Sequence, residues 1–390
     1  MSSRPRAAAL AALVLMGAAT LAGCGGDDHS STSNGSENGS SESSSQDALD
    51  KAYEGILGTP PAGPTAPPSG KRGGTVWVVS CGQSVPTCAT PSQAAADAAK
   101  AAGFDASVCD GKLSPQGWAD CIRQGISAKA AGIIVVGQDC AAFAAALQEA
   151  NDAGIPTIAG GGNDCDVVGE PKLFSATVQN MPDMTQQQWW EEMGALQADW
   201  LIGKTSGKAN VLSLKFTDSI WGGWVQDGFE AELKTCNGCK VGSTLELSNQ
   251  DLVSGTLPQK VSTALLKAPE VNSINLPIDG WMFAGLSQAI VSSTRSDQLN
   301  VIGAFGEPGN LDLIRKKGGE DATVAYVSSW GGWASVDTLI RVLNGEEPQP
   351  AGVGLQVIDA DHNMPDAGQP FSYNPSVDYA SAYTKLWAAS

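Results

Sequence analysis

The stretch from residue 132 to residue 162 constrains the fold more than any other part of the chain. It reads GIIVVGQDCAAFAAALQEANDAGIPTIAGGG. Residues 133–136 are uniformly apolar and too few for a helix, which predicts a strand buried on both faces. Apolar residues at helical spacing predict a helix over 141–152, ended by Gly154, before a second short strand at 157–159. This order is a right-handed βαβ unit of a parallel sheet.

The same alternation continues on both sides of this unit. Further strands are expected at 75–80, 104–109 and 174–177, with helices at 91–102 and 115–128. The pattern restarts with a long helix at 185–202, followed by strands at 209–214, 240–247, 273–276, 301–304, 322–327 and 353–358, and helices at 222–234, 252–266, 281–293 and 333–343. The fold class predicted is therefore α/β, with two doubly wound parallel-sheet lobes. A short helix is also possible at 46–57, and residues 361–390 lack a clear period and are expected to pack on the outside.

Length and charge limit the possible partners. A chain of 390 residues is long enough for two domains. Its formal net charge of −18 would repel a polyanion, and no basic cluster offsets that charge. We therefore expect no nucleic-acid partner.

The N-terminus carries an export signal. Arg4 and Arg6 precede an apolar stretch at 7–19 that is too short to remain in a bilayer, and Leu-Ala-Gly-Cys follows, ending at Cys24. This resembles the lipobox of bacterial lipoproteins, which implies a signal peptide over 1–23 and a diacylated Cys24 at the mature N-terminus. The alternative is an ordinary signal peptide with a chance cysteine. Residues 24–73 are rich in Ser, Gly and Pro and are expected to be a disordered tether, so the protein should be extracytoplasmic and lipid-anchored to the bacterial cell membrane.

The cysteines fit an exported chain. Nine cysteines minus Cys24 leave eight, an even number that suggests disulfide bonds. Our hypothesis pairs near neighbours: Cys81 with Cys88, Cys109 with Cys121, Cys140 with Cys165, and Cys236 with Cys239. A redox role for the last pair is a weaker alternative, because the intervening Asn-Gly is typical of a turn.

Three segments carry a resemblance to a known family. They are AGIIVVGQD with EANDAGIPTIAGG, then VIGAFGEPGNLDLIRKKG, and then ATVAYVSSWGGWASVDTLIRVLNGE. Their order resembles the type I periplasmic-binding-protein family, the ribose-binding-like receptors of ABC importers, over about residues 74–358. The resemblance implies two lobes joined by three crossovers, which we place near Gln179, Tyr326 and Gly352. The first lobe would comprise 74–179 with 327–352, and the second 180–326 with 353–390.

Polar residues follow the strands of the first lobe. Ligands of open α/β sheets bind beyond the carboxyl ends of the strands, and carboxylates and amides there suit hydroxyl-rich ligands. The candidates in the first lobe are Gln83, Ser84, Gln138, Asp139, Asn163, Asp164 and Gln179. For each of them a role in capping a helix or turn is an equally good interpretation.

The second lobe departs from the family pattern toward aromatic residues. Trp221-Gly222-Gly223-Trp224 stands where the ribose-like receptors carry a binding arginine, and Tyr326 replaces their hinge glutamine. Eleven tryptophans against eight phenylalanines is a high proportion, and indole faces stack on sugar rings as well as on aromatic ligands. The candidates here are Trp221, Trp224, Asp279, Trp281, Glu307, Tyr326 and Trp330, whereas Trp189, Trp190 and Trp200 are expected to be ordinary core.

These observations predict a solute-binding lipoprotein of an ABC importer, which traps a sugar or sugar-sized molecule in an aromatic-rich cleft by hinge closure. Its expected partners are the ligand, the permease and the membrane, and the protein is expected to be a monomer. A sensory receptor of the same fold and a binder of aromatic or nucleoside-type solutes remain alternatives. An enzyme is not expected, because the only histidines, His29 and His362, cannot supply a triad or a histidine metal site. No metal or cofactor is expected either.

Overall fold

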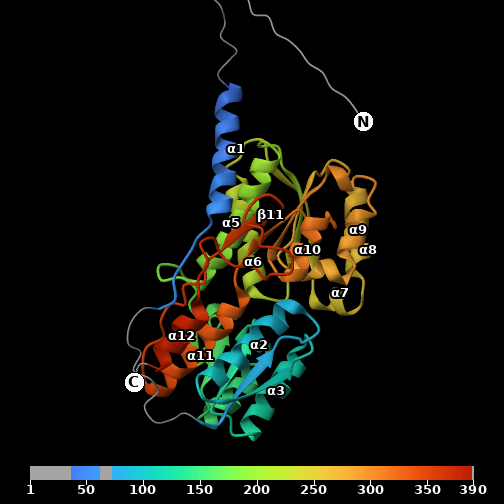
Figure 1. The fold of residues 1–390 in the computed structure, drawn as a ribbon. Helices are drawn as coiled ribbons and strands as arrows, with labels where there is room; N and C mark the ends of the chain where they lie inside the picture. The colour runs from blue at the N-terminus through green and yellow to red at the C-terminus, as the bar shows by residue number, and fades with distance from the viewer. Residues whose placement is uncertain (1–36, 62–72, 389–390) are drawn as a thin grey trace, which may run out of the picture.

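The computed structural model describes residues 37–61 and 73–388, which form two lobes, each built on its own sheet (Figure 1). The first sheet has the order β2-β1-β3-β4-β5, and all of its pairings are parallel. Its strands are β1 (Thr75–Ser80), β2 (Asp105–Asp110), β3 (Gly132–Val136), β4 (Thr157–Gly160) and β5 (Ala176–Thr177). The predicted α/β fold with two parallel-sheet lobes is confirmed.

The central strand of the first sheet is buried on both faces, as its uniform sequence predicts. Ile133 and Val135 pack toward α3 (Pro115–Ser127) and α4 (Ala144–Asp152). Ile134 and Val136 belong to the core that includes the alanine-rich helix α2 (Pro86–Ala101). Successive side chains point to opposite faces of a strand, so only a strand covered on both sides can use apolar residues throughout.

The second sheet is larger and has the order β11-β10-β9-β8-β6-β7. All of its pairings are parallel except that of the edge strand β11 with β10. Its strands are β6 (Asn210–Phe216), β7 (Lys240–Leu247), β8 (Ser273–Asn275), β9 (Asn300–Phe305), β10 (Ala322–Ala325) and β11 (Gln356–Asp359).

The helices of the second lobe differ from the predicted ones mainly by breaks. Helix α5 (Gln186–Lys204) packs along α6 (Ile220–Leu233) and reaches β9, β10 and β11. The expected helix 252–266 is interrupted, because Gly255 has a positive φ and a new helix begins at Leu257, with Pro258 in its first turn. The remaining helical elements are α7 (Asn249–Val253), α8 (Leu257–Lys267), α9 (Leu286–Val291) and α10 (Pro308–Lys316), with short 3₁₀ turns at Cys140–Ala142, Cys165–Val168, Asp279–Ala284 and Ser296–Gln298.

The chain passes between the lobes at residues 178–185, 326–327 and 345–355. Helix α11 (Ser328–Asn344), which follows the second passage, packs on α2 and β4 of the first lobe. The first and third passages are joined, because Ala351 N donates to Gln179 O and Gly352 N donates to Asn180 O.

The C-terminal segment differs from its expected place in the second lobe. After β11 the chain returns to the first lobe, where α12 (Tyr379–Ala388) packs on α11 (Figure 1). Trp387 stacks on Trp333, with ring centroids 5.5 Å apart, and donates from Nε1 to Asp337. Residues 361–390 have no helical period in their sequence, and the position of α12 depends on aromatic contacts with α11. The local sequence pattern therefore did not predict this fourth passage.

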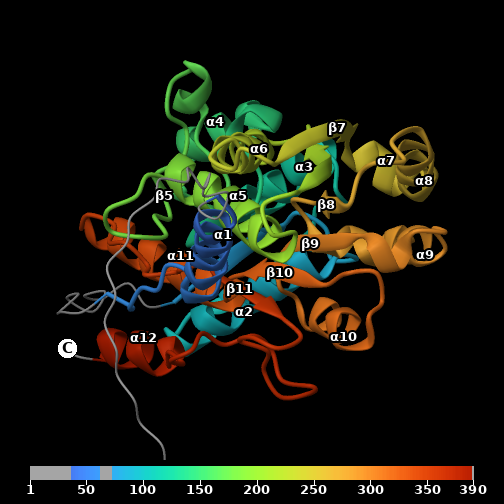
Figure 2. The same ribbon diagram turned by 90° about the horizontal axis from the view of Figure 1, so that it is seen from above.

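Part of the expected tether is ordered. Helix α1 (Glu37–Glu54) packs along α5, as Figure 2 shows from above, so the described residues 37–61 do not form a disordered linker. Lys51 Nζ lies 2.9 Å from the buried carboxylate of Asp199, and Ile56 pairs with Leu355 across an isolated antiparallel bridge. Residues 1–36, which include the expected signal peptide and Cys24, lie outside the described residues.

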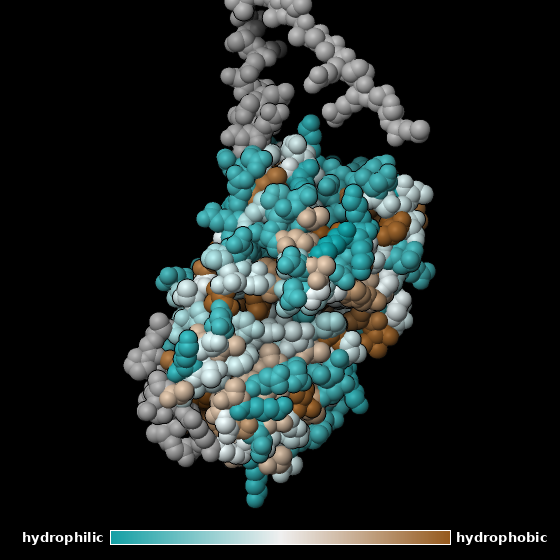
Figure 3. Space-filling model, viewed as in Figure 1, coloured by the Kyte–Doolittle hydropathy of each residue, from teal (hydrophilic) through white to brown (hydrophobic). Residues whose placement is uncertain are grey.

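The four predicted disulfides are confirmed. Cys81–Cys88, Cys109–Cys121 and Cys140–Cys165 lie in the first lobe, and Cys236–Cys239 closes the turn before β7. Within residues 37–61 and 73–388, no helix is both long and apolar enough to span a bilayer. The surface seen in Figure 3 is mostly hydrophilic, with hydrophobic residues in small groups.

Candidate functional site

The candidate site is a cavity between the lobes, where the carboxyl ends of the strands of both sheets face each other. Val136 to Gln138 and Gly160 line it from the ends of β3 and β4, and Phe216 and Phe305 line it from the ends of β6 and β9. Its volume is about 110 Å³. This is where open α/β sheets bind ligands.

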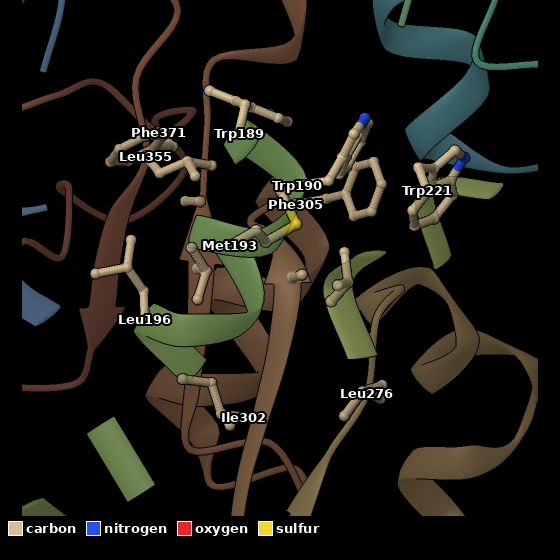
Figure 4. Packing of buried hydrophobic residues seen from close by; sticks show 14 of the residues in the cluster. Trp189, Trp190, Met193, Leu196, Trp221, Leu276, Ile302, Phe305, Leu355 and Phe371 are labelled. Carbon is tan, nitrogen blue, oxygen red and sulfur yellow. The ribbon is translucent and has the colours of Figure 1, made fainter. Parts of the chain in front are cut away.

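The second lobe contributes an aromatic wall. Trp189 and Trp190 directly follow the capping box between Thr185 and Gln188 that fixes the start of α5. Trp221 lies in the first turn of α6, whose N-cap Ser219 accepts from Gly222 N. These helix starts bring the rings of Trp190 and Trp221 together, stacked with centroids 4.7 Å apart and beside Phe305 (Figure 4).

Two further aromatic residues complete this wall. Trp281, which is 1% exposed, meets Phe216 edge to face at 5.9 Å between centroids. Tyr326 begins the second passage between the lobes and packs on both Phe305 and Trp189. The wall is therefore held by ring-to-ring contacts that do not depend on a bound ligand.

The first lobe presents apolar, small and amide residues to the same cavity, with Val85, Pro91 and Leu113 among the apolar ones. It contributes Gln138, Gly160, Gly161 and, from the first passage, Asn180. A Cβ at Gly162 would lie 1.9 Å from Gln138 O, so this glycine is required for the two strand-end loops to lie against each other. The run Gly160-Gly161-Gly162 thus shapes the site through close backbone packing.

Asp139 joins the two lobes. Its Oδ2 accepts from Ile220 N at the start of α6, 2.8 Å away, and its Oδ1 accepts from the backbone and side chain of Asn163. Burial raises the pKa of the Asp139 carboxyl, and these hydrogen bonds oppose the rise. Asp139 and Asn163, both expected to bind ligand, are hydrogen-bonded within the protein and do not line the cavity.

Glu307 makes a second link between the lobes. Its carboxylate accepts from Thr90 of α2 at 3.0 Å and from Ser328 of α11 at 3.1 Å. Burial raises the pKa of Glu307, and the two hydroxyl donors lower it. The side chain does not line the cavity, although Ser328 does.

Other expected polar residues serve the fold. Asp164 accepts from Cys165, Leu173 and Phe174 backbone N–H groups, as the capping alternative predicts. Gln179 donates to the carbonyls of the 181–184 loop. Gln83 and Ser84 are exposed and away from the cavity.

Asp279 lies fully buried behind the aromatic wall. Its Oδ2 accepts from Gly306 N at 2.7 Å and from Thr323 Oγ1 at 3.1 Å. Burial raises its pKa well above the ordinary value, and so does the nearby carboxyl of Glu307. Asp279 therefore shapes the loop after β9 and has no place in the cavity lining.

The tryptophans divide differently from the prediction. Trp221 and Trp281 line the cavity, but Trp224 does not, and Trp330 is buried against Tyr379 with stacked rings 5.4 Å apart. Trp200 is core, donating to Asp359. Trp189 and Trp190 belong to the core, as expected, and both also line the cavity, which was not expected. Their place at the start of a helix that follows a lobe passage was the signal that could have indicated this.

The cavity lining carries no titratable group that could act as a nucleophile, acid or base, apart from the phenol of Tyr326, whose pKa burial raises far above its ordinary value. The one cluster with metal-like spacing in the described part of the chain is Cys140, Asp164 and Cys165, and its two sulfurs are joined to each other. The arrangement suits binding by shape and stacking.

Comparison with known proteins agrees with this geometry. A family model described as "Periplasmic binding protein domain" matches residues 77–347. No curated protein sequence matches the chain.

Several solved structures share the fold. One is a glucose-galactose binding protein from Geobacillus stearothermophilus, with 20% identity, a TM-score of 0.61, and coverage of 75% of this chain and 99% of that one. Another is a 5-methylthioribose transporter solute-binding protein from Thermotoga lettingae, in complex with 5-methylthioribose, with 16% identity, a TM-score of 0.62, and coverage of 80% and 96%. A third is an ABC transporter solute-binding protein from Agrobacterium vitis with bound allitol, with 17% identity, a TM-score of 0.58, and coverage of 74% and 96%.

Proposed function

Because the chain belongs to the periplasmic binding protein family, we propose that it is the solute-binding lipoprotein of an ABC importer and traps a sugar-sized molecule between its lobes. The observation that carries this proposal is the cavity at the facing carboxyl ends of the two sheets. A concave site lined mainly by apolar and aromatic residues, with a small number of polar groups, is the usual form of a small-molecule site. The protein binds its solute and performs no chemistry on it.

Capture proceeds by closure of the lobes about their passages. In the closed arrangement, Asp139 reaches the start of α6 and Glu307 reaches Thr90, so each edge of the cleft has a carboxylate link. Opening breaks these links and wets the aromatic wall. A solute that contacts both lobes shifts the equilibrium toward closure by its differential affinity for the two states.

Delivery requires the membrane and a permease. The lipobox ending at Cys24 supports an anchor at the outer face of the cytoplasmic membrane, and a single protein copy is enough for capture. The similar solved structures described as parts of ABC transporters support a permease as the partner.

The test uses the full chain expressed in a bacterium with lipoprotein processing. Native mass spectrometry of the gently purified protein should show a bound small molecule, and X-ray scattering should show a smaller radius of gyration with that molecule than after its removal. Cys24→Ser should move the protein out of the membrane fraction without changing solute binding. Solute turnover by the purified protein, or no solute of any class bound, would overturn the proposal.

A further inference from the structure

The cavity between the lobes lacks charge. No Asp, Glu, Lys, Arg or His of the described residues lines it. Asp139, Asp279 and Glu307, which were expected to bind the ligand, accept hydrogen bonds from protein groups. A charged ligand would therefore lose its hydration without gaining a counter-charge, which is far more costly than burying a neutral group.

The wall that the second lobe contributes is flat and aromatic. Trp190 and Trp221 stack with 23° between their planes, and Phe305 and Tyr326 pack beside them. Aromatic faces gain most from another flat ring in an offset or edge-to-face arrangement. A puckered ring makes fewer contacts with such surfaces.

The size of the closed cavity points to one ring. Its volume of about 110 Å³ is somewhat below that of an engineered apolar cavity of roughly 150 Å³ that binds benzene. A single six-membered ring is close to the largest rigid body that the closed arrangement can admit. A ring that carries a substituent, benzamide included, would hold the lobes somewhat further apart.

Few polar groups are available for a ligand. The hydroxyls of Ser328 and Ser335 already donate to Glu307 and to Gly331 O. The carboxamides of Gln138, Asn180 and Asn249, the hydroxyl of Thr87 and the phenol of Tyr326 line the cavity and have no side-chain hydrogen-bond partner among the described residues, and the buried indole N–H of Trp190 has none either. A sugar ring has a hydroxyl on nearly every carbon, and each one buried without a partner costs about 1–3 kcal/mol.

A carboxamide offers one acceptor and two donors, and it pairs well with a ligand edge that offers the same. From these observations we infer that the solute is a small, uncharged, planar aromatic ring with an amide-like edge, held between the indole wall and the carboxamides of the lining. This inference rests on the proposed function and narrows its ligand to one chemical class.

The test compares matched probes by calorimetry and thermal shift. Benzamide should bind and raise the melting temperature, since a ligand of the folded state stabilises it by mass action. Cyclohexanecarboxamide keeps the amide but loses planarity, and it should bind at least about tenfold more weakly. Benzoate and trimethylphenylammonium test charge of either sign, and D-glucose and D-allose test the polyol class; all four should leave the melting temperature unchanged.

Protein variants locate the binding. Trp221→Ala should weaken benzamide binding by more than about tenfold. Trp224→Ala, one turn further along α6 and outside the cavity, is the matched control and should leave the affinity unchanged. Gln138→Glu and Asn180→Asp keep size and shape but add charge, and should weaken benzamide binding about tenfold. Circular dichroism of each variant checks folding, and these two near-isosteric variants serve if Trp221→Ala does not fold.

The outcomes separate this inference from the proposed function. Saturable binding of either sugar with no binding of benzamide would overturn the aromatic ligand class and leave solute capture intact. Binding of benzoate or trimethylphenylammonium at least as strong as that of benzamide would overturn the requirement for an uncharged ligand. Failure of every probe and of native mass spectrometry to show a ligand would overturn both proposals.

Discussion

The two faces of the cleft use different chemistry on similar frameworks. The first lobe presents small residues and the carboxamide of Gln138, whereas the second presents Trp190, Trp221 and Trp281. Both surfaces lie at the carboxyl ends of parallel strands. The comparison teaches that sheet topology fixes where a ligand can lie, while the residues at the helix starts decide what it can be.

The lobes also differ in how they are held together. The first lobe has the smaller sheet, and helix α2, which covers one face of it, is rich in alanine. This lobe contains three of the four disulfides. The second has a six-stranded sheet and the additional helix α1. Alanine buries little apolar surface, so covalent links add stability where the core is thin.

The largest expected effect is a loss of stability on removing a tryptophan that is buried in the core and does not line the cavity. Trp330→Ala removes a fully buried ring from the first-lobe side of the molecule, and we expect the free energy of unfolding to fall by about 3–5 kcal/mol. Trp224→Ala, at a half-buried position, should lose less. Chemical denaturation measures both. A Trp330→Ala protein with unchanged stability but lost binding would place this ring in the site after all.

The disulfides provide the next contrast. Replacing Cys140 and Cys165 by Ser opens a loop with a sequence separation of 25, and should cost about 3.5 kcal/mol of unfolding free energy. The same change at Cys236 and Cys239, separated by 3, should cost about 1.6 kcal/mol. Denaturation of the two double variants tests the comparison. Equal losses would show that loop closure does not account for the stability of the first lobe.

A smaller effect is expected at the carboxylate links. Asp139→Asn weakens a charge-assisted hydrogen bond to Ile220 N and should shift the ratio of open to closed molecules about tenfold toward open, equivalent to about 1.4 kcal/mol. Glu307→Gln is the matched change at the other edge. X-ray scattering of the ligand-free protein should show a larger radius of gyration for both. An unchanged value would mean that the passages alone set the closed arrangement.

Many carboxyl groups contribute to the dependence of stability on pH, and the effect expected from each single group is the smallest of those considered. Burial raises the pKa values of Asp139, Asp279, Glu307 and Glu320, so the folded protein binds more protons than the unfolded chain above the ordinary carboxyl range near pH 4. Stability should therefore fall as the pH rises from 5 to 8, and melting curves at the two values should show it. Below about pH 4 the trend reverses, because hydrogen bonds lower the pKa of Asp251 to about 2 and its contribution is lost on protonation.

Asp139→Asn with Glu307→Gln provides the control for this trend. The double variant should keep the part of the pH dependence that Asp279, Glu320 and the other buried carboxyls supply, including Asp199, whose pKa burial raises to about 7. A wild-type melting temperature that rises from pH 5 to pH 8 would contradict the assigned directions.

Much of the fold followed from local patterns. The uniform run at 133–136, the alternation of strands and helices and the near-neighbour cysteines predicted both lobes and all four disulfides. These features depend on residues close in sequence. Helix α10 was missed although Pro308 at its start could have indicated it, and α12 was missed because its stability comes from indole contacts with α11.

The sequence by itself determined the fold class, the edge of each sheet at which a ligand can lie, and the abundance of indole there. Only the tertiary structure decided which rings line the cavity: Trp189 and Trp190 do, while Trp224 and Trp330 do not. It also showed that Asp139, Asn163 and Glu307, which were candidate ligand contacts, form hydrogen bonds with other groups of the protein. The physical reason is that periodicity fixes a helix or strand locally, whereas the direction of a side chain relative to a distant lobe depends on how the finished elements pack.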